Sequence, residues 1–116
     1  MPVLLMFVNS YLDAIGKVLK GEFDLIVELT KPEKIYEIFS KDCEKIIASY
    51  KKGEIDREIA KRNFFLLKSY VVSQLGIHVG RLKSLANEKG IEISYEIEEG
   101  FINEVAMMID EKEKEL

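Results

Sequence analysis

The chain has 116 residues, of which 47% are apolar and 33% are charged, and this length and composition predict one folded domain over residues 1–116. They exclude a disordered chain, a collagen and a disulfide scaffold. With one cysteine, one histidine and a net charge of −4, the sequence also excludes an internal disulfide, a cysteine-based zinc site and a strongly basic nucleic-acid binder, and it favours a cytoplasmic protein.

The first predicted element is a helix over about residues 3–20, because apolar residues recur there every three or four positions. It opens with the apolar run from Val3 to Val8. Asn9 interrupts this run too early for a bilayer span, and no basic residue precedes it as in a signal peptide, so we expect no membrane segment. Residues 23–29 alternate like a strand and also continue the helical repeat. We favour a helix there and leave the strand open.

The second predicted helix has a clear start signal. Thr30 and Glu33 match a capping box, in which each side chain bonds the backbone amide of the other residue. Pro32 suits the first turn of a helix, where no amide donor is needed. The helix is expected to end before Gly53, which suits the left-handed conformation after a helix end.

The third predicted helix is the longest and runs from Asp56, a good N-cap, to about residue 88. Apolar residues cover nearly all of its sides, which is typical of a central helix. The main apolar stripe consists of Ala60, Phe64, Leu67, Val71, Leu75, His78, Leu82 and Leu85. A narrow strip of small residues remains, made of Ser69, Ser73, Gly76, Gly80 and Ser84.

Residues 91–97 alternate like a strand, although an extended lead into the next helix fits equally well. Helical spacing returns from about Glu98, and residues 110–116 form a charged tail that we expect to fray. Together these elements predict an all-α fold, a three- to four-helix antiparallel bundle with one long central helix over about residues 56–88.

Three side chains are candidates for chemistry. His78 lies on the main apolar stripe, so a buried structural role is favoured over a catalytic one, because a general base needs a second polar group nearby. Asp42 is the one acidic residue on a core-like face, and a pairing with His78 is open. Cys43 shares that face and is expected to act as a small apolar residue. We expect no catalytic residue, no cofactor and no metal site.

The strip of small residues predicts an interface. Each glycine inside a helix costs about 0.8–1 kcal/mol relative to alanine, and close packing of a neighbouring helix can offset that cost. The neighbour is either another helix of this chain or a second chain. A helix of 32 residues is about 48 Å long and would overhang a compact domain of this size. We therefore expect a homo- or hetero-oligomer.

Charge is unevenly distributed along the sequence. Residues 61–87 contain five basic and no acidic side chains, whereas residues 92–116 contain nine acidic and two basic ones. If nucleic acid binds at all, phosphate contacts are expected from Lys61, Arg62, Lys68 and Lys83, but the binding should be weak. The abundance of lysine and glutamate, 30 residues in all, indicates a thermophilic source.

The long predicted helix carries a pattern that consists of Arg62, Asn63, Leu66, Tyr70, Leu75, Ile77, Arg81, Leu85 and Ala86. This pattern resembles the central helix of GINS subunits, a four-subunit helical scaffold of the archaeal and eukaryotic replicative helicase. A final helix with Glu98, Glu99 and Phe101 is also similar. The resemblance spans residues 30–110 and implies an archaeal assembly subunit in DNA replication. The chain departs from the family because it has no room for the small β-rich domain of GINS subunits.

The function predicted from the sequence is a non-catalytic helical scaffold or interaction subunit that acts through the third helix. Two alternatives stay open. One is a small helical nucleic-acid-associated or regulatory subunit, similar to the small subunits of CRISPR effectors. The other is a helical enzyme centred on His78. The sequence names neither the partner nor the stoichiometry.

Overall fold

The computed structural model describes residues 7–93 and 96–116, and within those residues it contains helices and no β-strand. The all-α prediction is confirmed. No helix in these ranges is both long and apolar enough to cross a membrane. The elements in chain order are α1 (Ser10–Leu19), α2 (Leu25–Leu29), α3 (Pro32–Lys51), α4 (Arg57–Tyr70), the π-helical turn η2 (Val71–Leu75), α5 (Gly76–Glu88) and α6 (Phe101–Glu113).

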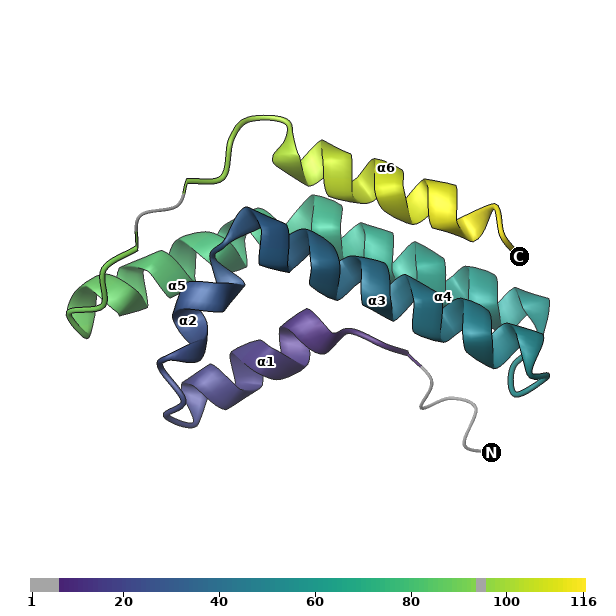
Figure 1. Ribbon diagram of the computed structural model, residues 1–116, viewed down its shortest axis with the longest axis horizontal. Helices are drawn as coiled ribbons and strands as arrows, with labels where there is room; N and C mark the ends of the chain where they lie inside the picture. The colour runs from purple at the N-terminus through teal and green to yellow at the C-terminus, as the bar shows by residue number, and fades with distance from the viewer. Residues whose placement is uncertain (1–6, 94–95) are drawn as a thin grey trace.

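The long helix predicted over residues 56–88 is confirmed, because α4, η2 and α5 follow one another without a break over 32 residues. It spans the molecule, whose longest dimension is 46 Å (Figure 1). α3 packs against its α4 part, α6 packs against its α4 and η2 parts, and α3 and α6 pack against each other. α1 packs on α3, and the short α2 links α1, α3 and α5.

The core lies where α1, α3, α4 and η2 meet. The rings of Tyr11 and Phe39 stack with their centroids 5.7 Å apart, and Tyr70 packs within 6.4 Å of both. Phe64 of the long helix is buried as well. Burying such large rings is the main term that stabilises a domain of this size.

The first helix begins later than predicted. Its N-cap is Asn9, whose side chain accepts a hydrogen bond of 3.0 Å from the Leu12 amide, so α1 starts at Ser10 and residues 7–9 precede it. An asparagine of this kind satisfies an amide at the helix start. The part of the prediction that concerns residues 3–6 lies outside the described residues.

The capping box predicted at Thr30 is wrong. The Thr30 hydroxyl donates to the carbonyl of Ile26 at 2.9 Å, so Thr30 closes the end of α2. The N-cap of α3 is Lys31, with no side-chain cap bond. Pro32 does occupy the first turn of α3, and the helix favoured for residues 23–29 is confirmed for Leu25–Leu29, the extent of α2, after a turn at residues 23–24.

The π-helical turn changes which side chains face the core. Phe65, Val72 and Val79 are seven residues apart, so a regular α-helix keeps them on one face. Phe65 and Val72 are 68% and 62% exposed, whereas Val79 is 3% exposed. η2 adds one residue to a turn and thereby rotates the residues after it by about 100°. The long helix therefore has two registers, and its outer face is not buried as a central helix would require.

The last helix is longer and better anchored than predicted. It begins at Phe101 and continues through Asp110 to Glu113, residues that the sequence assigned to a fraying tail. Residues 91–93 and 96–98 belong to neither a helix nor a strand, and residues 94–95 lie outside the described part of the chain. Two alternatives were open for residues 91–97, a strand or an extended lead into the last helix. The described residues agree with the second.

Candidate interaction surfaces

The outer face of the long helix consists of apolar side chains that no other part of the described chain buries. Phe65, Leu66, Val72 and Ile77 are all exposed, the last by 52%. They alternate with the small-residue strip and follow the helix from α4 across η2 into α5. A run of large exposed apolar side chains on one helix is a typical feature of a protein interface.

The small-residue strip faces open space. Ser73, Gly76, Gly80 and Ser84 are exposed, and Ser69 is half-buried. A methyl group placed on either glycine would meet no atom within 4 Å in the described structure. No helix among the described residues packs closely against these glycines, so within that part of the chain the first explanation for the strip finds no support.

Basic side chains flank the outer face. Lys61 and Arg62 are exposed and lie one turn before Phe65 and Leu66, a spacing that places each cation next to an apolar side chain. Residues 61–87 supply no carboxylate that would neutralise them. The outer face is therefore apolar with a basic rim.

The other two predicted phosphate contacts differ from this pair. The Lys68 ammonium donates to the Asp110 carboxylate of α6 at 2.8 Å. Lys83 lines a cavity of about 400 Å³ together with Glu92 and Glu96. Lys68 is thus paired with a carboxylate, and Lys83 shares a cavity with two, which weakens the attraction of both lysines for phosphate. The four residues do not form one basic patch.

A second surface lies between α3 and α6. Two cavities of about 700 and 470 Å³ share Tyr36 and Glu104 and so form one continuous groove. The groove is lined by Pro32, Glu33, Tyr36, Glu96, Glu98, Glu99, Gly100, Phe101, Glu104, Met107, Met108, Glu111, Lys112 and Glu115. The sequence analysis missed this groove, although the excess of acidic residues after residue 92 was a signal for it.

The groove is acidic around an apolar centre. Tyr36 and Met107 are exposed, while Phe101 and Met108 are nearly buried beneath them. Seven of its lining residues are glutamates, and its one cation, Lys112, donates to Glu44 at 3.1 Å. The Glu44 carboxylate raises the pKa of Lys112 above its ordinary value. The groove thus keeps a strong negative charge.

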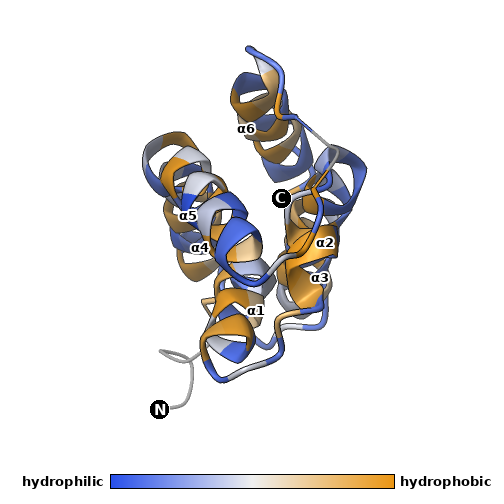
Figure 2. Cartoon of the chain, turned by 90° about the vertical axis from the view of Figure 1, so that its left-hand side faces the viewer, coloured by the Kyte–Doolittle hydropathy of each residue, from blue (hydrophilic) through white to orange (hydrophobic). Residues whose placement is uncertain are grey.

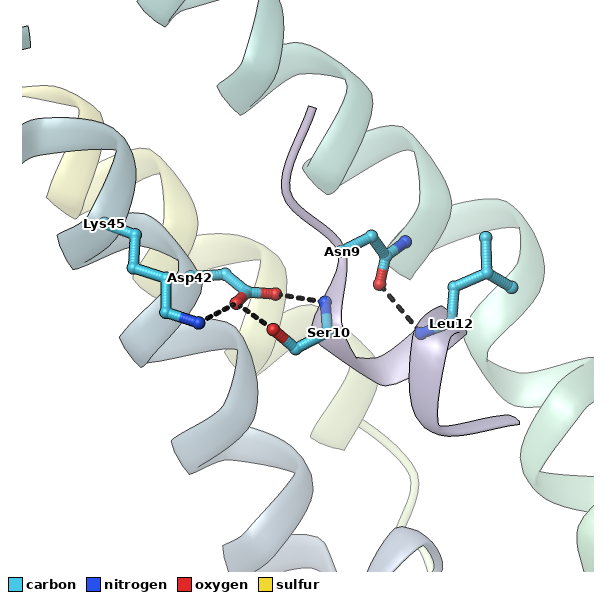
Figure 3. A network of polar contacts seen from close by, with 5 residues as sticks. All are labelled: Asn9, Ser10, Leu12, Asp42 and Lys45. Carbon is cyan, nitrogen blue, oxygen red and sulfur yellow. Dashed lines mark hydrogen bonds and ion pairs between the residues drawn. The ribbon is translucent and has the colours of Figure 1, made fainter. Parts of the chain in front are cut away.

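Asp42 connects α3 to the start of α1 (Figure 3). Its carboxylate is fully buried and accepts from the Ser10 amide at 2.7 Å and from the Ser10 hydroxyl at 2.6 Å. The Lys45 ammonium approaches it to 3.9 Å. These contacts hold the start of α1 against α3. Asp42 therefore has its own partners, and the possible pairing with His78 is not formed.

His78 is hydrogen-bonded to Tyr70, a residue of the core. Its Nδ1 lies 2.6 Å from the Tyr70 hydroxyl, and the two rings are 5.4 Å apart. Desolvation, together with the nearby Arg81, lowers the pKa of His78, and burial raises the pKa of Tyr70. His78 lines neither the α3–α6 groove nor the cavity beside Lys83.

Cys43 is a free cysteine on the buried face of α3. Cys43 is buried, and burial with the adjacent Asp42 raises the pKa of its thiol to about 12, which keeps it protonated and unreactive. Within residues 7–93 and 96–116, no three histidine, cysteine or acidic side chains converge in a way that would hold a metal ion.

Comparisons with known proteins identify relatives. A family model described as AF0941-like matches residues 5–116. A protein of Archaeoglobus fulgidus is 43% identical over 114 residues, which cover 97% of this chain and 100% of the relative. A solved structure, "Predicted coding region AF0941 from Archaeoglobus fulgidus", has a TM-score of 0.89 at 43% identity and covers 95% of this chain and 97% of its own. The resemblance to GINS subunits is wrong, because the family model that spans nearly the whole chain is a different one.

Proposed function

The chain belongs to the AF0941-like family, and we propose that it acts as a non-catalytic helical interaction subunit that binds a partner protein through the outer face of its long helix. The observation that carries this proposal is the exposure of Phe65, Val72 and Ile77 on one side of that helix. Burying one such side chain stabilises a complex by about 1.5–3 kcal/mol.

The proposal also accounts for the glycines in the long helix. Gly76 and Gly80 face open space, so packing within the chain does not offset their cost to the helix. A partner that approaches the backbone closely at this strip would offset it. In this proposal the antiparallel arrangement expected of α3, α4 and α6 serves to keep the outer face rigid.

A protein partner is favoured over nucleic acid. Lys68 is paired with Asp110, Lys83 lies beside Glu92 and Glu96, and the net charge is −4. Strong binding to nucleic acid requires several phosphates to be neutralised by free cations. The non-catalytic part of the proposal rests on Asp42 and His78, whose polar atoms bond Ser10 and Tyr70.

The experiment is affinity purification from the source organism with three forms of the full chain. The parent is compared with a face variant, Phe65→Asp with Val72→Asp, and with a control variant, Leu19→Asp. Leu19 is 74% exposed on α1, so the control adds a charge at an equally exposed apolar position. Circular dichroism first verifies that all three forms are helical.

We expect one set of proteins to be retained by the parent and by the Leu19→Asp form and to be lost from the face variant, because a carboxylate on this face would have to be desolvated on binding. Quantitative mass spectrometry measures the difference. If the face variant retains the same proteins as the parent, the outer face is not the binding surface and the proposal fails.

A further inference from the structure

The two surfaces of this protein are complementary in chemistry. The outer face of the long helix presents Phe65 and Val72 beside Lys61 and Arg62. The α3–α6 groove presents an apolar centre, and glutamates surround it. Charge complementarity of this kind steers two surfaces together and sets their register.

The two surfaces also match in length. From Phe65 to Ile77 the outer face extends over twelve residues, or about 18 Å of helix. Along α6 the groove runs from Phe101 to Lys112, which corresponds to about 17 Å. An amphipathic helix face that lies in an apolar groove is a common mode of protein recognition.

The surfaces point in different directions. In the view along the long helix, α4 and α5 lie on one side of the molecule, α3 lies on the other, and α6 lies at the top between them (Figure 2). A single chain therefore cannot place its own outer face in its own groove. A second copy can, and the pair then keeps one surface of each kind free, the groove of one copy and the outer face of the other.

We propose that copies of this chain associate head to tail, with the outer face of the long helix of one copy bound in the α3–α6 groove of the next. The inference rests on the proposed function, since it assigns the partner of the outer face. Contacts of this heterologous kind close into a ring or extend as a chain, depending on the rotation between neighbours. Glu104 would lie against the basic side chains of the neighbour's outer face, and Met107 would lie against its apolar side chains.

The test uses sedimentation velocity on the full chain and on two variants. The face variant is Phe65→Asp with Val72→Asp, and the groove variant is Tyr36→Asp with Met107→Asp. All four residues are exposed, so both variants are expected to fold. The face variant keeps its native groove, and the groove variant keeps its native outer face. The two altered surfaces both gain negative charge and repel each other. Leu19→Asp again serves as the control.

We expect the parent and the control to form particles larger than a monomer, and the association should weaken as the salt concentration rises above ~0.15 M, because charges contribute to it. Each variant alone should sediment as a monomer. An equimolar mixture should give a one-to-one dimer of twice the monomer mass that does not grow further, since only one pair of native surfaces remains.

Three results would overturn the inference. They are a parent that stays monomeric from micromolar to millimolar concentration, a mixture that stays monomeric, and a groove variant that associates as strongly as the parent. The last would indicate a symmetric contact between two outer faces. A monomeric parent whose affinity-purified partners still depend on Phe65 and Val72 would reject self-association while keeping the proposed function.

Discussion

The inner and outer faces of the long helix both carry large apolar side chains but differ in what surrounds them. Phe64 packs in the core against the rest of the chain, at 1% exposure, while its neighbour Phe65 projects away from it. On the inner face, apolar side chains stabilise the fold. On the outer face they contribute little to folding and remain available to a partner. In the proposed account Phe64 contributes to stability and Phe65 to binding, and the predictions below test that separation.

The largest expected effect comes from the two phenylalanines. Phe64→Ala should lower the free energy of unfolding by about 3–5 kcal/mol, because it leaves a cavity in the core. Phe65→Ala should change it by less than about 0.5 kcal/mol, since the ring has few contacts to lose. Urea denaturation of both variants measures the difference. Similar losses from the two substitutions would mean that the outer face is buried in the protein as it exists.

The second-largest effect is expected at Asp42, the buried carboxylate of α3 that bonds the start of α1. Asp42→Ala should cost about 1–3 kcal/mol, because it leaves the Ser10 amide and hydroxyl without their acceptor. Lys45→Ala is the matched control and should cost less than about 1 kcal/mol, because the lysine is exposed and 3.9 Å away. Thermal denaturation compares them. An equal effect from both would show that the ion pair, and not the bonds to Ser10, holds α1.

Replacement of a glycine on the outer face should raise the free energy of unfolding, whereas the substitutions above lower it. Gly80→Ala should raise the free energy of unfolding by about 0.8–1 kcal/mol, because alanine favours a helix and the added methyl meets no neighbouring atom. Gly53→Ala is the contrasting control: at φ +77° an alanine is strained, so stability should fall. A loss of stability from Gly80→Ala in a monomeric preparation would reveal a close neighbour within the chain.

The smallest expected effect is on the pH dependence of the protein's stability. The pKa of His78 is lowered in the folded protein by desolvation and by Arg81. Below the ordinary histidine pKa of about 6.5, the unfolded chain binds a proton that the folded protein resists, so stability falls as the pH drops. His78→Phe should reduce the loss in melting temperature between about pH 7 and pH 5. An unchanged loss in the variant would show that other groups cause it.

The sequence predicted the inner face of the long helix well, because burial there follows a simple repeat of three and four residues. Phe64, Leu67 and Leu75 are buried as expected, and Asp56 caps the helix through the Ile59 amide at 2.9 Å. The outer face was harder to predict. Nothing in the residue pattern signals that a π-helical turn moves Val79 into the core while Val72 stays outside.

Other differences arose where two local patterns compete or where distant segments meet. The hydroxyl of Thr30 has two possible backbone partners, and the preceding helix, rather than the following one, binds it. The partner of Asp42 lies 32 residues away in sequence, so spacing along one helix gave no information about it. The α3–α6 groove needs Tyr36 and Met107 to meet across two helices, and only the tertiary arrangement brings them together.

The central claim, that the outer face of the long helix binds a protein, is tested most directly by photo-crosslinking in cells of the source organism. A photoreactive phenylalanine analogue replaces Phe65 in one form of the chain and Leu19 in another, both at exposed positions on different helices. The account predicts one discrete crosslinked product from position 65 and none from position 19. A product with twice the chain mass would identify a second copy as the partner. If position 65 gives no product, or the same products as position 19, the claim is contradicted.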